Sequence, residues 1–428
     1  MTTSTTTKSN LWFLGPIRDG ALIIGTPLLI LPLAWLLCQS RSGTAAVIVI
    51  GAFGQLGHCL PGLIRAYGDH KLFRRYRTRF IAAPLALGTA CLLAVRNNLD
   101  VLILVGVTWA VWHALMQTYG FLRIYNARSG RLSTTLRRLE FGMCFLWFGG
   151  AILLNEQPLT LLLHRWYGAG GILLPASLVA AVQMIWLTAL VAVTLAYAGM
   201  VVRSHLTGSP IALPSVLTMI SGTGFYWFAY AGATNILVGA AMFEIFHDVQ
   251  YLTIVWLFNR RRVEQSAGVG GFVRFLFRRS GALVGVYIGI VCAFGGLRLI
   301  ESSLPAGIPG EALTALLALT GLLHYYYDGF IWKVRDESTR ESLGIRSDRT
   351  DGRRLNLSGY VHALKWTVAA IPILWLTCVE SVVQPDETTC RLLVQRSLSS
   401  TGFAHVLVSA SPDSESAIVA PEGSIRLR

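Results

Sequence analysis

Charged residues are scarce in this chain of 428 residues: Asp, Glu, Lys and Arg together make up 14%, where a soluble domain carries about 25%. Apolar residues make up 54% of the chain, and 42 Gly come in addition. This composition excludes a soluble globular enzyme, a disordered chain and a collagen-like chain. It predicts a protein whose helices cross a membrane several times.

Motifs of several familiar enzyme classes are also missing. The seven Cys residues contain no C-x-x-C spacing, so the sequence predicts neither a disulfide framework nor a zinc cluster. No G-x-G-x-x-G motif follows a strand, and there is no P-loop and no G-x-S-x-G elbow, so nucleotide-dependent and acyl-transfer chemistry have no support. No two His are adjacent, which excludes the paired histidine boxes of common membrane desaturases and hydroxylases.

A helix needs about 20 mostly apolar residues to cross a bilayer, and about eleven stretches of this chain meet that need. They lie at 21–38, 44–65, 80–96, 100–123, 138–154, 176–202, 211–231, 235–258, 281–300, 312–333 and 361–381. We therefore predict an all-α, polytopic transmembrane helical bundle of about 11 spans, in one domain over residues 21–383. Residues 1–20 are predicted to be a polar N-terminal segment, and 384–428 a polar, disordered tail. The stretch 155–175 is predicted to be an interfacial or re-entrant loop.

The net charge of +14 arises from 36 Lys and Arg against 22 Asp and Glu, and the basic residues gather in four clusters. The clusters cover 65–79, 123–138, 260–279 and 333–354, each at the exit of an even-numbered predicted span. By the positive-inside rule these exits face the cytoplasm, and so does the N-terminus. We expect a bacterial inner-membrane protein, in which membrane orientation accounts for the charge without a nucleic-acid partner.

An ionisable residue inside a membrane span is costly and by default indicates a functional site. Each even-numbered span from the second to the tenth, except the sixth, contains one His, and no other span has a His well inside it. These residues are His58, His113, His247 and His324, which lie 7, 10, 13 and 9 residues before Arg65, Arg123, Arg260 and Lys333. At 1.5 Å per helical residue, these separations are depths of about 10–20 Å. If the four helices adjoin, the imidazoles can converge on one point.

Further polar residues lie three or four positions from these His and so share their helix faces. They are Glu244 and Tyr251 on either side of His247, Gln117 after His113, and Asp328 after His324. Asp248 lies four residues after Glu244 and shares the face of that carboxylate. Neutral imidazole suits iron, zinc, copper and nickel, and a neighbouring carboxylate can be a ligand or can fix the imidazole tautomer. We predict that the four His bind a metal. Glu244, Asp248 and Asp328 are predicted to be ligands or to support the ligands, and Gln117 and Tyr251 to orient them.

These residues predict an integral-membrane, metal-dependent oxygenase, hydroxylase or desaturase that uses non-haem iron. Its partners would be a membrane lipid or another lipophilic small molecule, and an electron-donor protein. Two alternatives use the same residues. One is a transporter or proton-coupled channel with a relay of His and Asp. The other is a metal-free membrane scaffold in which each His hydrogen-bonds a neighbouring helix.

Four short motifs resemble the bacterial Brp/Blh family, integral-membrane carotene oxygenases that cleave β-carotene to retinal at a His-bound iron. The motifs are Leu56-Gly57-His58, His113-x-x-x-Gln117, Phe246-His247 and His324-x-x-x-Asp328-x-x-Ile331. The resemblance implies a metal-binding role for the four His. The chain departs from the family because Tyr251 stands where the family has the second His of a His-x-x-x-His pair, and because no Asp closely follows His58 or His113. We therefore carry over the metal site and not the substrate.

Overall fold

The computed structural model describes residues 11–130, 133–265, 271–278, 282–305, 307–332, 358–383 and 385–399. The first half of the chain contains α1 (Pro16–Asp19), α2 (Thr26–Leu37), α3 (Arg41–Gly57), α4 (Cys59–Gly68), α5 (His70–Arg75), α6 (Arg77–Arg96), α7 (Asp100–Arg128), α8 (Thr134–Leu153), α9 (Glu156–Gly168) and α10 (Ala176–Leu206). The second half contains α11 (Leu213–Trp227), α12 (Ile236–Gln265), α13 (Gly271–Leu276), α14 (Ala282–Gly295), α15 (Leu297–Ser303), α16 (Ile308–Ile331), α18 (Ser358–Val383) and α19 (Glu387–Leu398). Two five-residue π-helices, Gly20–Ile24 and Phe228–Gly232, complete the set.

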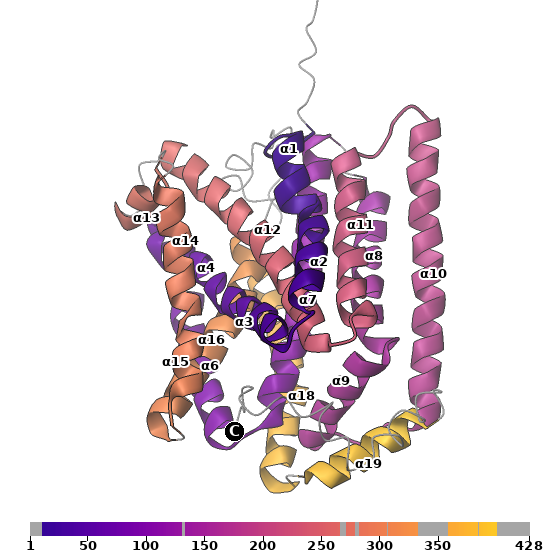
Figure 1. The fold of residues 1–428 in the computed structure, drawn as a ribbon, viewed down its shortest axis with the longest axis vertical. Coiled ribbons are helices and arrows are strands. Elements are labelled where there is room, and N and C mark those ends of the chain that lie inside the picture. The colour runs from indigo at the N-terminus through magenta and orange to yellow at the C-terminus, as the bar shows by residue number, and fades with distance from the viewer. Residues whose placement is uncertain are drawn as a thin grey trace, which may run out of the picture.

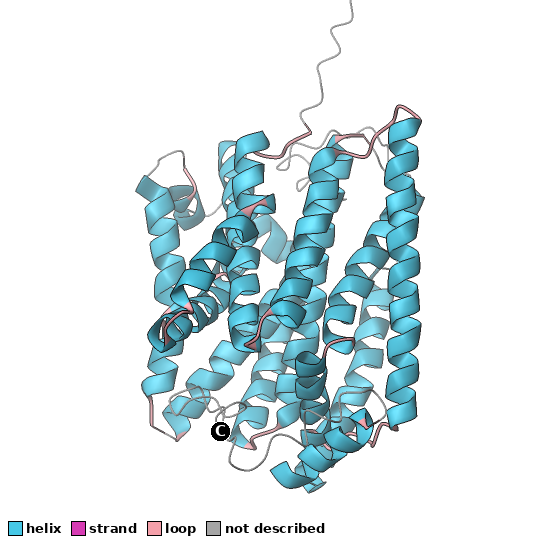
Figure 2. Ribbon diagram, turned by 45° about the vertical axis from the view of Figure 1, so that its right-hand side comes forward, coloured by secondary structure: helices cyan, strands magenta, loops and turns pink. Residues whose placement is uncertain are grey.

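The predicted all-α class is confirmed, since the described residues form helices and loops and contain no strand (Figure 2). The helices make one bundle, along one edge of which α10 runs (Figure 1). A central apolar core joins α7, α8, α11 and α12. In this core the rings of Phe148 and Tyr226 stack at 4.1 Å, and Phe243 meets Tyr226 edge-on at 4.7 Å.

The predicted count of about eleven spans is not confirmed. Five helices are long and apolar enough to cross a membrane, and the number rises to seven if each of two bent helix pairs is one span. These seven coincide with the predicted spans that begin at residues 21, 44, 80, 100, 138, 176 and 281. The other four predicted spans are helical but fall short, because α12 and α16 carry polar residues, α11 is short, and only Ala370–Val383 of α18 counts as an apolar helix. The described helices are compatible with an integral membrane protein.

The second predicted span is broken at His58, which lies between the end of α3 and the start of α4. Pro61 explains the position of the break. Proline has no N–H to donate to the carbonyl of the residue four positions earlier, here Gly57, and its ring crowds that carbonyl. Gly57 also passes close to α14, because a Cβ on Gly57 would lie 2.7 Å from the backbone oxygen of Val291. His58 therefore lies at the junction of α3 and α4, which together still form a single stretch long enough to cross a membrane, Arg41–Gly68.

The exits of the His-bearing helices gather at one end of the bundle. Arg262 at the end of α12 pairs with Asp69 after α4 at 2.6 Å, and the guanidinium of Arg65 in α4 lies 3.8 Å from the ring of Trp332 after α16. A buried apolar cluster there joins the N-terminal segment to the ends of α7 and α12 through Phe13, Tyr125 and Phe258. The four helices therefore run in the same direction. The fourth basic cluster, 333–354, lies outside the described residues.

The stretch 155–175 contains helix α9, Glu156–Gly168, which bends by 80° from α8. Such a bent pair is either one broken span or a re-entrant segment, so the predicted re-entrant loop stays a prediction, with a helix inside it. The prediction for the C-terminal tail needs correction. Residues Glu387–Leu398, predicted to be disordered, form α19, which packs on α9 and α10 at the lower end of the bundle (Figure 1). Its buried side chains, Cys390, Val394 and Leu398, recur every four residues, so one face of a mostly polar helix meets the bundle. Residues 400–428 of the predicted tail lie outside the described residues.

Candidate metal centre

The four predicted His come together from four different parts of the chain. His58 lies at the α3–α4 joint, His113 in α7, His247 in α12 and His324 in α16. Their side chains are buried, with exposed fractions of 1%, 8%, 3% and 1%. Each ring can offer one nitrogen such that all four nitrogens lie within 4.8 Å of one another. The convergence that the common depth predicts is therefore present in the structure.

The four imidazoles form a closed ring in which each meets two neighbours edge-on. Ring centroids lie 5.2 Å apart for His58 and His247, 5.1 Å for His247 and His113, and 4.6 Å both for His113 with His324 and for His324 with His58. The Nε2 atom of His324 lies 3.1 Å from the Nε2 of His58 and 3.1 Å from that of His113. Three ring nitrogens therefore face one small volume.

This donor set fits a metal ion. A metal–nitrogen bond is about 2.0–2.1 Å long, so two nitrogens on one ion are at most about 4 Å apart, close to the spacing of these atoms. In addition, each nitrogen of a neutral imidazole carries either one proton or one lone pair. The Nε2 atom of His324 therefore cannot make good hydrogen bonds to the Nε2 atoms of both His58 and His113. A cation among these nitrogens would satisfy lone pairs that the protein groups leave facing one another.

Asp248 and Glu244 make a second group with His58. The Oδ1 atom of Asp248 lies 2.7 Å from the Nδ1 atom of His58, on the side of the ring that faces away from His324. Glu244 places a carboxylate oxygen within 4.8 Å of both residues, and its Oε2 atom is buried without a hydrogen-bond partner. The same Nδ1 atom also lies 3.3 Å from the carbonyl oxygen of Gly54. The carboxylate and this carbonyl both favour a proton on Nδ1, which leaves Nε2 of His58 free to bind a metal.

Asp328 and Tyr251 lie beside the four imidazoles rather than among them. The Oδ2 atom of Asp328 is 3.8 Å from the Nε2 atom of His324, too far for a hydrogen bond. Its Oδ1 atom instead accepts hydrogen bonds from Tyr251 Oη at 3.2 Å and Trp332 Nε1 at 2.9 Å. The ring of Tyr251 stands edge-on to His324 at 5.0 Å, so these groups pack against the site and fix its wall.

Gln117 acts on a backbone and not on a ring. Its Nε2 atom donates to the carbonyl of His247 at 3.0 Å and to Oε1 of Gln250 at 3.2 Å, and Gln250 in turn donates to the carbonyl of Ile23. Gln117 therefore contacts α12, which carries His247, and its orienting role stays a prediction. Gln250 was missed in the sequence, although it lies three residues after His247 on the same helix.

Two glycines of the second span leave the space that the site occupies. A Cβ on Gly54 would overlap the Oδ2 atom of Asp248, and a Cβ on Gly62 would lie 2.8 Å from the hydroxyl of Tyr251 and 3.4 Å from His324 Nδ1. Gly54 and Gly62 flank His58 by four residues on either side. Their lack of a side chain lets α12 and α16 approach the joint at His58.

Arg65 belongs to the first basic cluster, whose members are expected to lie at the membrane interface, but its side chain is buried. It is 3% exposed, and its guanidinium packs on the faces of Phe258 and Trp332, at 3.9 Å and 3.8 Å from the centroids of these two rings, which meet edge-on at 5.0 Å. A guanidinium is planar and weakly hydrated, so it stacks on aromatic faces at modest cost. Trp332 therefore contacts both Arg65 and Asp328, and joins the basic end of the bundle to the wall of the site.

Two cavities lie next to the site and share Tyr325, whose ring is 4.9 Å from that of His113. One has a volume of about 340 Å³, and its lining includes Leu56 and Cys59, which lie within two residues of His58. The other has a volume of about 990 Å³ and is lined largely by Leu, Val and Trp side chains. Their sizes are those of small-molecule sites.

No protein-family model, curated protein or solved structure matches the chain. The geometry of the four imidazoles, the carboxylates beside them and the two cavities is therefore the basis for any functional conclusion.

Proposed function

We propose that the protein is an integral-membrane, metal-dependent oxidoreductase, an oxygenase, hydroxylase or desaturase, that acts on a lipophilic substrate. His58, His113, His247 and His324 would hold the metal, for which we propose non-haem iron. The observation that carries the proposal is the ring of four buried imidazoles with nitrogens within 4.8 Å. When bound, iron would supply the capacity to activate oxygen, and three or four protein ligands leave it open positions.

The protein groups have separable roles in this proposal. Asp248 accepts the Nδ1 proton of His58 and so directs the Nε2 lone pair inwards. Gln117 holds the backbone of His247, and Tyr251 with Trp332 holds Asp328 beside His324. The two cavities bring apolar surface up to the site, which admits a lipophilic molecule and excludes water.

We also propose that the protein lies in a bacterial inner membrane with its N-terminus in the cytoplasm. The gathering of basic residues at one end of the bundle supports this orientation, because cytoplasmic loops carry the excess of Lys and Arg. The proposed partners are a membrane-derived substrate and, for a hydroxylase or desaturase, an electron-donor protein that supplies the two electrons the reaction needs.

Metal analysis of the purified full-length protein tests the proposal. We expect about one iron per chain after gentle extraction, and a loss of most of that metal in His247→Ala and His324→Ala. His205→Ala is the matched control, because His205 is an exposed residue at the end of α10. Oxygen consumption that depends on added lipid and reductant would then identify the reaction class. A wild-type protein without stoichiometric metal would contradict the proposal and would leave a His and Asp relay of a transporter as the better hypothesis.

A further inference from the structure

The two cavities beside the metal centre differ in chemical character. Their common wall is Tyr325, which packs 4.9 Å from His113 and 5.7 Å from His324. None of the four His lines either cavity, so Tyr325 is the residue through which both cavities meet the site. A ligand that reached past Tyr325 from one cavity to the other would lie next to two of the four imidazoles. The lining of each cavity then indicates the chemistry of the ligand end that it would bind.

The larger cavity, of about 990 Å³, suits an apolar chain. Its lining includes Trp109, Trp112, Leu162 and Phe330, and Gln183, which also lines it, already donates to the carbonyl of Leu153 at 2.9 Å. An apolar chain in this cavity would lose its contact with water, at about 25 cal/mol for each Å² buried. A polar group there would find few partners.

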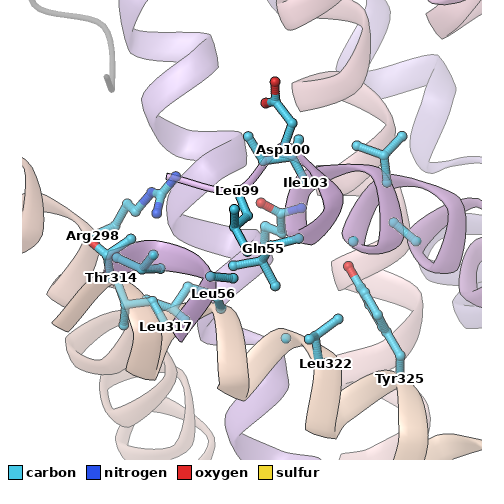
Figure 3. A pocket seen from close by; sticks show the side chains of 18 of the residues that line it. Gln55, Leu56, Leu99, Asp100, Ile103, Arg298, Thr314, Leu317, Leu322 and Tyr325 are labelled. Atoms are coloured by element: carbon cyan, nitrogen blue, oxygen red, sulfur yellow. The ribbon is translucent and has the colours of Figure 1, made fainter. Parts of the chain in front are cut away.

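The smaller cavity holds an amide that no protein group satisfies. Gln55 lies in α3, within the Arg41–Gly68 span and three residues before His58, and its side chain points into the cavity (Figure 3). The side chain is exposed to this space and makes no hydrogen bond among the described residues. A polar side chain within a membrane span is costly unless it has a partner, so an unpaired amide beside the metal centre indicates a ligand group.

The charged residues at the rim of the smaller cavity argue for an uncharged ligand group. Arg165 pairs with Asp100 at 2.6 Å, and Arg298 pairs with Glu301 at 3.0 Å (Figure 3 shows Asp100 and Arg298). Each positive charge thus has its own carboxylate. A carboxylate or phosphate on the ligand would compete with those partners, whereas a hydroxyl or carbonyl can bond to the free amide of Gln55 without displacing any charge.

We infer that the metal centre acts on an asymmetric lipid, whose apolar chain occupies the larger cavity and whose hydroxyl or carbonyl group binds Gln55 in the smaller one. This inference rests on the proposed function and narrows its substrate class from lipophilic molecules in general to lipids with one uncharged polar end. Tyr325 then determines which carbon atoms of the chain lie beside His113. A plain hydrocarbon would leave the amide unpaired, and a site built for a hydrogen bond discriminates against ligands that lack it.

Photo-crosslinking of the metal-loaded, full-length protein tests the inference with a matched pair of probes. One probe is a 16-carbon primary alcohol with a diazirine near its far end, and the other is the alkane of the same length with the same diazirine. We expect the alcohol to label the α7 segment that carries Trp109 and Trp112. In Gln55→Met, which keeps the side-chain length but loses the amide, labelling by the alcohol should fall about tenfold while labelling by the alkane is unchanged. Gln39→Met is the control, since Gln39 is exposed and bonds only to the carbonyl of Trp35.

The outcomes separate this inference from the function on which it rests. Metal content equal to that of the wild type shows that Gln55→Met is folded. If the metal-loaded protein is labelled equally by both probes, or if Gln55→Met does not reduce labelling by the alcohol, the inference is wrong while the proposed metal centre stands. If the alcohol labels a wild-type protein that holds no metal, and Gln55→Met loses this label while Gln39→Met keeps it, the ligand site stands and the oxidoreductase proposal fails.

Discussion

The Nδ1 atom of His58 lies 2.7 Å from Oδ1 of Asp248, while Nε2 of the same ring lies 3.1 Å from Nε2 of His324. One imidazole therefore links a buried carboxylate to the ring of four His. The carboxylate fixes which nitrogen of His58 carries a proton, and the opposite nitrogen becomes available to a metal. We therefore expect the metal affinity of the proposed centre to depend on Asp248, which is not one of the four His.

Replacement of Asp248 by Asn tests this dependence. The amide keeps the size of the carboxylate but removes its charge, so we expect metal affinity to fall by about 10–100-fold. Competition with a chelator of known affinity measures the change. Asp386→Asn is the control, because Asp386 caps the exposed start of α19 and Asn serves equally well there. Equal affinities in the two variants would show that Asp248 does not orient His58.

Replacement of Gly54 by Ala tests the same contact from the other side. The added Cβ would overlap Oδ2 of Asp248, so the carboxylate must move and its pairing with His58 must weaken. We expect a loss of metal affinity of at least about tenfold, similar to that of a lost supporting carboxylate. Gly120→Ala in α7 is the matched control, since a Cβ there meets nothing within 4 Å. The idea fails if Gly54→Ala binds metal as tightly as Gly120→Ala does.

Removal of Glu140 is predicted to destabilise the bundle. This fully buried carboxylate accepts hydrogen bonds from Asn126 at 2.6 Å, Arg123 at 3.1 Å and Ser215 at 3.3 Å, and so joins α7, α8 and α11. Glu140→Ala leaves a mostly buried guanidinium without its partner, at a cost of about 3 kcal/mol. Thermal unfolding in detergent should show a clear drop in Tm. Glu264→Ala, which removes the exposed pair with Arg260, should leave Tm unchanged, and equal drops would count against the network.

Alkylation of Cys390 reports whether α19 stays on the bundle. Burial raises the pKa of the Cys390 thiol, and Glu387 and Asp100 raise it further. Since the thiolate is the reactive form, we expect slow reaction with iodoacetamide near pH 7.5 and a rate that keeps rising above pH 8.5, the usual thiol pKa being about 8.5. Val394→Asp should release the helix and speed the reaction, whereas Leu392→Asp on its exposed face should not. Mass spectrometry of the Cys390 peptide measures the rate, and rapid reaction in the wild type would show that α19 is not docked.

The helical class and the convergence of the four His could be predicted from residue types and spacing. His58, His113, His247 and His324 are costly at membrane depth, and their common distance from the basic clusters indicated that they could meet. Asp248 was singled out by its spacing of four residues from Glu244, but its contact with His58, on another part of the chain, could not be read from that spacing. The span count was not confirmed, in part because α12 and α16, which carry His247 and His324, are not apolar enough to count as membrane spans.

Other features arise only when distant helices pack together. Gln55 drew no attention in the sequence because a single Gln has no spacing pattern, and it becomes informative only as an unpaired group in a cavity. The sequence predicts that Arg65 is an interfacial anchor, whereas in the structure its guanidinium packs on the rings of Phe258 and Trp332. The face of α19 with Cys390 and Val394 belongs to a mostly polar helix, and only its contact with α9 and α10 shows that the segment is ordered.

The sequence by itself determined which helices carry the imidazoles and how deep they lie, since hydropathy and charge act locally along the chain. The tertiary structure decided which nitrogen of His58 faces the other imidazoles and that Asp328 lies 3.8 Å from Nε2 of His324, too far for a hydrogen bond. It also decided that Tyr325 lines two cavities of different chemical character. These depend on side-chain direction and on the close approach that Gly54 and Gly62 allow, and no local rule specifies contacts between residues more than 200 positions apart.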